Sequence, residues 1–144
     1  MGLILRLLVA AGLAADAIVH WRFAPEMAFV QGGSIDGELL FRIQAAVAGV
    51  VAVVILTYAT RWAYALAFLV AGSAVGAIVF YYYVDAGALG PLPDMHEPIW
   101  YTEKTISLVG EGIATLAALA GFFTASRGKR EDDPAHEPQH ASPL

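Results

Sequence analysis

Four long apolar runs constrain this chain more than any other feature of its sequence. They cover residues 3–19, 39–57, 63–84 and 101–123, and each falls within the range of about 17–25 residues that a transmembrane helix needs. Together they use up most of the 144 residues, and only 15% of the chain is charged, whereas about a quarter is usual in soluble domains. The sequence therefore predicts an integral membrane protein without a soluble domain.

The composition excludes several classes of site. The chain contains no cysteine, which excludes disulfides, thiolate catalysis, Cys-ligated zinc and iron–sulfur clusters. It also lacks a glycine-rich phosphate loop, a nucleophile elbow and an HExxH-type zinc motif. The net charge of −5 does not favour nucleic acid as a partner. The expected partner is the lipid bilayer, with another membrane protein or a second copy of the chain as further candidates.

The predicted fold is all-α, a four-helix antiparallel transmembrane bundle formed by residues 1–125. Only a few residues join the second and third apolar runs, so these two helices are expected to be antiparallel neighbours. Residues 21–37 and 85–98 are predicted loops because they contain Gly and Pro. Residues 126–144 are charged and contain Pro, and we expect them to form a disordered cytoplasmic tail.

Small residues recur at a spacing that allows close contact between helices. The pairs and series are Gly72-x-x-x-Gly76, Ala45-x-x-x-Gly49, and Gly110, Ala114, Ala117 and Gly121. Such spacing lets helix backbones approach each other, which is a main source of helix association in membranes. We therefore expect these residues at the contacts within the bundle.

The distribution of Lys and Arg predicts the orientation. With four spans, both termini lie on one side of the membrane. Arg6, Arg61, Arg127, Lys129 and Arg130 fall on that side, and Arg22, Arg42 and Lys104 fall on the other. We expect a multi-pass protein of the cell inner (plasma) membrane with both termini cytoplasmic. The first run is expected to stay in the protein as a helix. Unlike in a signal peptide, Arg6 interrupts the run instead of preceding it, and Asp16 and His20 follow at once.

An acidic residue lies inside the last apolar run. Glu111 comes eight residues after Glu103, which places it roughly 12 Å further along a helix axis. A charged carboxylate at that depth costs several kcal/mol unless it is paired, hydrated or protonated. The other helices are therefore expected to supply polar neighbours at their outer ends. The predicted ligand or proton site consists of Asp16, His20, Arg42, Gln44, Glu103 and Glu111.

This polar group has two interpretations. In the structural one, Arg42 neutralises Glu111 or Asp16 in a buried pair that fixes the register of the helices. In the functional one, a hydrated pocket moves protons between Glu111, Asp16 and His20, or it binds a small cation or a polar ligand. Acidic residues outnumber basic ones on the outer side of the predicted bundle, which favours an acidic vestibule.

No cofactor is indicated by the sequence. A haem held by two histidines needs both on facing helices, and His20 is the only histidine at the boundary of a span. His20, Asp16 and Glu111 are suitable metal ligands by type, but spacing alone does not bring them together, so no metal site is predicted. His136 and His140 are interpreted as incidental histidines of a solvated tail. Catalytic residues are not indicated either.

Three features of the sequence resemble a known group of proteins. A His follows a short first span, the second span opens with ELLFRIQAAVAG, and the last span carries a Glu in SLVGEGIA. From Ala10 to Leu119 the chain resembles small four-helix bacterial membrane proteins, which are similar in general architecture to the DoxX-like group. The resemblance implies the four-helix fold. The broader group includes proteins linked to quinone-coupled redox work.

These observations predict a small integral membrane protein with an outward-facing acidic polar pocket. Its expected role is that of a non-enzymatic accessory subunit, or of a protein that handles protons or a small ligand. The alternative is a quinone-linked component of a membrane oxidoreductase. A visible absorbance band or a co-extracted quinone in the purified protein would favour that alternative.

Overall fold

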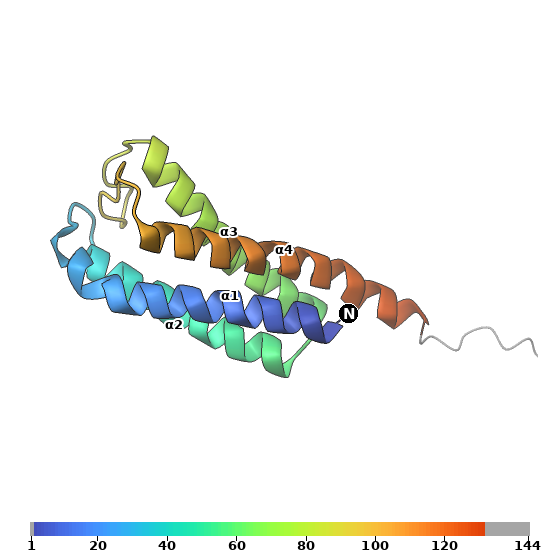
Figure 1. Cartoon of the computed structure of the whole chain (residues 1–144). Helices are drawn as coiled ribbons and strands as arrows, with labels where there is room; N and C mark the ends of the chain where they lie inside the picture. The colour runs from blue at the N-terminus through green and yellow to red at the C-terminus, as the bar shows by residue number, and fades with distance from the viewer. Residues whose placement is uncertain (1, 132–144) are drawn as a thin grey trace, which may run out of the picture.

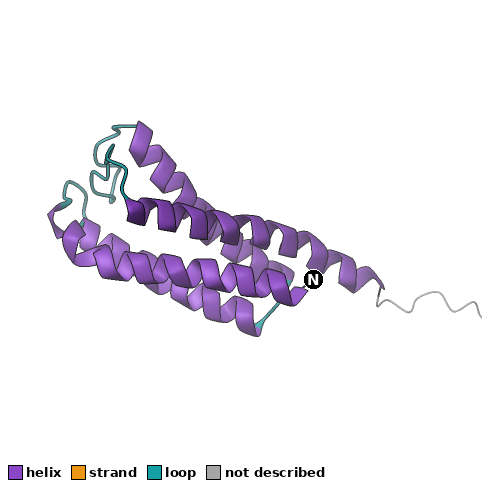
Figure 2. Ribbon diagram, viewed as in Figure 1, coloured by secondary structure: helices purple, strands orange, loops and turns teal. Residues whose placement is uncertain are grey.

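The computed structural model describes residues 2–131 and the side chains of residues 2–125. Within this range the chain forms four long α-helices and one short 3-10 helix, with no strand (Figure 2). Their bounds are α1 Gly2–Phe23, η1 Ala24–Phe29, α2 Gly37–Thr57, α3 Arg61–Tyr83 and α4 Thr102–Glu131. The prediction of an all-helical fold with four long helices is confirmed.

The first helix extends further than the sequence suggested. α1 continues through His20 to Phe23, and the 3-10 helix η1 occupies part of the predicted loop at residues 21–37. The α-helix ends where Pro25 enters the first turn of η1, because proline has no N–H to donate and restricts the residue before it. At the other end of the chain, α4 runs past Phe123 to Glu131. Residues 132–144, the rest of the predicted tail, lie outside the described residues.

Alanine fills the interior, and the large apolar side chains face outward. Eleven of the buried hydrophobic residues inside the helical bundle are alanines: Ala10, Ala45, Ala48, Ala52, Ala63, Ala67, Ala71, Ala74, Ala114, Ala117 and Ala118. Leu3, Val53, Leu69 and Leu116 are among the exposed residues. All four helices are long and apolar enough to cross a membrane. In water such an apolar surface would be unfavourable, whereas lipid would solvate it.

Each helix contacts only some of the others. α1 contacts both α2 and α4 along its length, and α3 packs mainly on α4. The α1–α2 and α3–α4 connections lie at one end of the molecule, and the N-terminus and the short α2–α3 connection lie at the other (Figure 1). Toward the first of these ends, which we call the loop end, α3 leans away from α1 and α2 (Figure 1).

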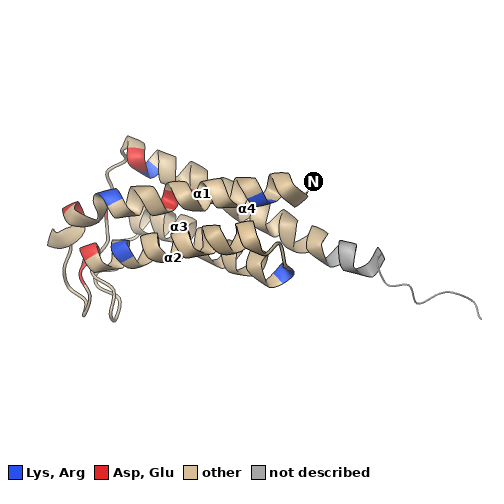
Figure 3. Cartoon of the chain, turned by 90° about the horizontal axis from the view of Figure 1, so that it is seen from below, with Lys and Arg blue, Asp and Glu red and all other residues tan. Residues whose placement is uncertain are grey.

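The two connections at the loop end are bonded to each other. The Ile35 N–H donates to the Pro91 carbonyl, and the Asp94 N–H donates to the Gln31 carbonyl, each at 3.1 Å. Gly33 lies so close to Pro91 that a side chain there would overlap its carbonyl oxygen. Most Lys, Arg, Asp and Glu residues of the described chain also gather at this end (Figure 3). The loop end therefore consists of two connections joined by hydrogen bonds, and it carries most of the charged side chains of the described chain.

Glycine sets the contact between α1 and α4. A Cβ atom on Gly12 would overlap the carbonyl oxygen of Gly110 and lie 2.8 Å from the Cβ of Ala114. The predicted close packing of the small residues in the last helix is therefore correct at Gly110 and Ala114. The predicted close packing is wrong at Gly49 of α2 and at Gly76 of α3, where an added Cβ meets nothing within 4 Å.

Substitution of Gly12 by alanine tests the α1–α4 contact. The added methyl group would force the two helices apart, and overpacking of this kind costs about 1–3 kcal/mol. Gly76→Ala is the matched control, because its methyl group enters open space. We expect a lower melting temperature in detergent for Gly12→Ala and little change for Gly76→Ala. Equal melting temperatures for the two variants would contradict the contact.

Candidate functional site

The α1–α4 contact brings two carboxylic acids into one interface. Asp16 follows Gly12 by about one helical turn, and Glu111 directly follows Gly110. Because the two glycines lie against each other, both acids lie at the seam between the helices. Each side chain is fully buried, with 0% exposure. The structure thus places together two of the residues predicted for the site.

Asp16 is held by partners from two helices. The Nδ1 atom of His20, one turn further along α1, lies 2.5 Å from Asp16 Oδ1 and 3.1 Å from the Asp16 backbone carbonyl. From α2, the Nε2 atom of Gln44 donates to Asp16 Oδ2 at 2.9 Å. The His20 ring also packs against Phe41 of α2, with ring centroids 4.7 Å apart. Asp16 therefore links α1 to α2 as well as facing α4.

Glu111 has no such partner. Neither of its carboxylate oxygens has a hydrogen-bond donor among the described residues, and the nearby Thr115 hydroxyl donates to the Glu111 backbone carbonyl instead, at 2.7 Å. One ligand atom each from Asp16, His20 and Glu111 lie within 4.8 Å of one another. Two carboxylates so close in an apolar interior repel each other and lose hydration. This group of three, which we call the acid cluster, therefore requires a proton or a cation.

Arg42 does not neutralise the acid cluster, and the predicted buried pair with Glu111 or Asp16 is wrong. Its guanidinium lies 2.6 Å from the carboxylate of Glu38 on the same helix and stacks over the Trp21 ring at 4.9 Å. Both partners of the ion pair are about one-third exposed. The i, i+4 spacing gives Arg42 a carboxylate near water, which avoids the desolvation that a buried pair would need.

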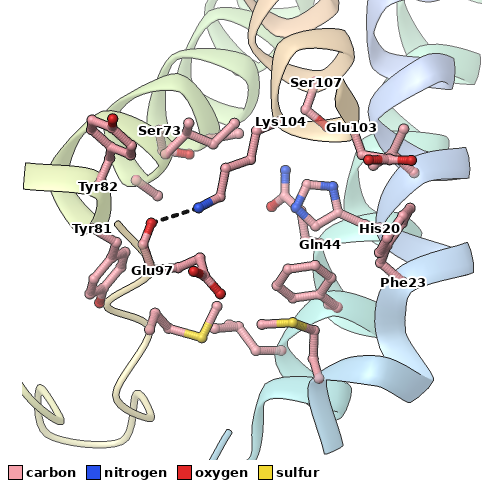
Figure 4. Close-up of a pocket in the computed structure, with 18 of the residues that line it drawn as sticks. His20, Phe23, Gln44, Ser73, Tyr81, Tyr82, Glu97, Glu103, Lys104 and Ser107 are labelled. Atoms are coloured by element: carbon pink, nitrogen blue, oxygen red, sulfur yellow. Dashed lines mark hydrogen bonds between the residues drawn. The ribbon is translucent and has the colours of Figure 1, made fainter. Parts of the chain in front are cut away.

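A cavity of about 320 Å³ lies beside the acid cluster, at the loop end of the bundle (Figure 4). Its volume falls in the range of small-molecule sites. Most of its wall is apolar, from Val19, Phe23, Met27, Leu40, Phe41, Ala74, Ala77, Ile78, Leu92 and Met95. His20 and Gln44 also line it, and both contact Asp16. The cavity therefore touches the partners of the acid cluster, while the two acids themselves do not line it.

The polar part of the wall comes from the start of α4 and the loop before it. Lys104 points across the cavity (Figure 4) and donates to the backbone carbonyls of Glu97 at 2.7 Å and Ile99 at 2.8 Å. Glu103, predicted for the site, lines the cavity but is not one of the three converging residues. Partial burial and the carboxylate of Glu97 raise the pKa of Tyr101 above its usual value, so its hydroxyl stays protonated.

Several cavity residues were not singled out by the sequence. Tyr81 and Tyr82 resemble residues of an interfacial aromatic belt, yet they line the cavity because the end of α3 leans away from α1. Lys104 could have been found from the sequence, because a lysine in the first turn of an apolar helix indicates a polar site near that helix end. The packing of the loop against α3, through the hydrogen bond of His96 Nδ1 with the Tyr81 carbonyl at 2.9 Å, has no sequence signature.

The arrangement can hold a proton or a cation in the acid cluster and the polar end of a small molecule in the cavity. His20 is the link between the two, since it lines the cavity and contacts Asp16. No protein-family model, curated protein or solved structure matches the chain.

Gln44 and Arg42 provide a matched pair for testing which polar side chains the fold depends on. Gln44→Leu removes the donor to Asp16 Oδ2 and leaves a buried oxygen unsatisfied, which costs about 1–3 kcal/mol. Arg42→Leu removes a partly exposed ion pair worth about 0–1 kcal/mol. We expect a clear loss of thermal stability in detergent for Gln44→Leu and little for Arg42→Leu. The opposite order would show that Arg42 is the structural partner after all.

Proposed function

We propose that the chain is a multi-pass inner-membrane protein, an antiparallel four-helix bundle with both termini cytoplasmic and an architecture of the DoxX-like kind. Four long apolar helices and an alanine-rich interior with large apolar side chains outside support the membrane location. The excess of Lys and Arg near the two termini supports the orientation. In this orientation the loop end faces away from the cytoplasm.

Reporter fusions test this topology. An enzyme reporter fused after Leu144 is expected to be active in the cytoplasm, and one inserted near Gly90 is expected to be active outside it. Equal activity of both fusions on the same side of the membrane would contradict four spans. Mass spectrometry of the mature protein checks whether α1 is retained, and we expect the N-terminal residues to be intact.

We propose further that the protein binds a small amphipathic molecule and does not itself catalyse a reaction. The observation that carries this proposal is the cavity whose wall contains His20 and Gln44, both of which contact the buried Asp16. A hydrogen-bonding end of the ligand would lie at His20, Gln44 and Ser107. Its apolar body would lie among the aromatic, Met and aliphatic side chains of the remaining wall. Such a protein acts alone or as an accessory subunit of a membrane complex.

A lipid-soluble quinone is the second candidate for this ligand. Its carbonyl oxygens accept hydrogen bonds, which Gln44 and Lys104 on the cavity wall are able to donate. The contact of His20 with Asp16 also offers a proton route from the cavity to the acid cluster. In that case the protein is a quinone-linked component of a membrane oxidoreductase.

A cavity-filling substitution tests both candidates. Ala77 lines the cavity on α3, so Ala77→Phe fills part of it, whereas Val79 is exposed on a different face of the same helix and Val79→Phe serves as the control. Each protein is purified in mild detergent, and its organic extract is measured by mass spectrometry and by ultraviolet absorbance. We expect a bound molecule in the native chain and in Val79→Phe, and a several-fold lower amount in Ala77→Phe. A quinone spectrum in the extract selects the second candidate.

Retention of the same molecule in equal amount by Ala77→Phe would show that the cavity is not its site. An extract that contains only bulk phospholipid for all three proteins would contradict the ligand-binding proposal.

A further inference from the structure

The acid cluster has the composition and the geometry of a metal site. We infer that Asp16, His20 and Glu111 bind one divalent first-row metal ion, of the class of Zn²⁺, Mn²⁺ or Fe²⁺, inside the bundle. The inference does not depend on what occupies the neighbouring cavity. It concerns a separate ligand with its own set of donor atoms.

The donor atoms already converge. One atom from each residue lies within 4.8 Å of the other two. Ligand atoms at about 2.0–2.2 Å from a zinc ion lie roughly 3–4 Å from one another. Small rotations of the side chains therefore suffice to close the site, with no movement of the helices. Asp16 and His20 come from adjacent turns of α1, and Glu111 comes from the glycine contact on α4, so the backbone supplies this convergence.

The surroundings of Glu111 provide an independent observation that points to a bound cation. Its side chain is fully buried, and its carboxylate oxygens meet no nitrogen or hydroxyl donor among the described residues, since the polar side chain beside it is the carboxyl group of Asp16. Buried polar atoms are almost always bonded in folded proteins. A buried carboxylate whose polar neighbours are a second carboxylate and an imidazole has the surroundings of a metal ligand.

The charges around the cluster also favour a cation. Three basic side chains bond elsewhere: Arg42 to Glu38, Lys104 to the carbonyls of Glu97 and Ile99, and Arg6 to the carbonyls of Ile55 and Leu56. His20 contacts Asp16, and none of these other basic side chains balances the charge of the two carboxylates. A divalent ion balances both at once.

The type of donor narrows the choice of metal. One imidazole nitrogen and two carboxylate groups suit zinc, manganese and ferrous iron. The absence of sulfur ligands disfavours copper(I), and the imidazole disfavours magnesium and calcium, which prefer oxygen alone. Gln44 donates to Asp16 Oδ2 and orients the carboxylate, as partners of metal ligands commonly do. Asp16 Oδ1 now lies 2.5 Å from His20 Nδ1, and a metal ion would separate these two atoms and bind both residues.

Metal binding to the full-length protein tests the inference. The protein is purified without a histidine tag, exposed to Zn²⁺, Mn²⁺ or Co²⁺, desalted and analysed for bound metal. The background chain carries His136→Asn and His140→Asn, because these two histidines are outside the described residues and are able to bind metal by themselves. We expect one equivalent of metal for each background chain. With Co²⁺ we also expect a visible absorption band from nitrogen and oxygen ligands.

Three substitutions in this background locate the ion. Glu111→Gln keeps the shape of the side chain and removes a charged ligand, so we expect more than about 100-fold weaker binding and loss of the cobalt band. Gln44→Ala removes only the partner of Asp16, and such changes weaken metal binding by about 10–100-fold. Glu103→Gln, which lines the cavity outside the acid cluster, is expected to bind as tightly as the background chain.

The inference is overturned if the background chain itself binds no metal after desalting, a result that does not require any variant to fold. It is equally overturned if Glu111→Gln retains one equivalent with an unchanged cobalt spectrum. In the first case a proton shared by Asp16 and Glu111 balances the cluster instead. Neither result bears on the cavity ligand, which is measured separately by extraction.

Discussion

The burial of two carboxylic acids against each other is the constraint on which this structure depends. Asp16 and Glu111 are both fully buried in a bundle whose interior is otherwise mostly alanine. Burial of a charged carboxylate in an apolar interior lowers the stability of the fold unless the charge is balanced. The balance comes partly from Gln44 and His20, which contact Asp16. For Glu111 no donor exists among the described residues, so a proton or a cation must complete the site.

The rest of the fold places this pair and forms a cavity beside it. Gly12 and Gly110 let α1 and α4 approach closely enough for the two acids to meet. Hydrogen bonds, such as the one from Ile35 to Pro91, join the two connections at the loop end. The lean of α3 away from α1 at that end accommodates a cavity beside the cluster (Figure 1). His20 belongs to both the cavity wall and the cluster.

Much of this arrangement could be predicted from the sequence, because apolar runs and depth along a helix are local properties. The four helices followed from length and hydropathy, and the importance of Glu111 followed from a carboxylate deep in an apolar run. The partner of Arg42 was predicted wrongly, although the i, i+4 spacing of Glu38 and Arg42 was a signal for the ion pair that the structure shows. The cavity depends on the lean of α3 and on loop packing, neither of which leaves a residue pattern. The contact of Gly12 with Gly110 could not be predicted either. Many glycines in the chain have open space around them, so the sequence does not show which glycine lies at a helix contact.

Disulfide trapping across the α1–α4 contact tests the central claim most directly. The chain has no native cysteine, and the Ala15 Cβ lies 3.6 Å from the position of a Cβ on Gly110, within the range of about 3.5–4.5 Å found in disulfides. The double variant Ala15→Cys with Gly110→Cys leaves both acids in place. The control pairs Ala15→Cys with Gly112→Cys, where an added Cβ meets nothing within 4 Å.

Each protein is oxidised in native membranes, cleaved at a protease site inserted near Gly90, and run on a non-reducing gel. The account predicts that the two fragments stay linked in the Gly110 pair until a reductant is added, and that they separate in the Gly112 pair. Separation of the fragments in both pairs, or equal linkage in both, would contradict the contact that brings Asp16 and Glu111 together.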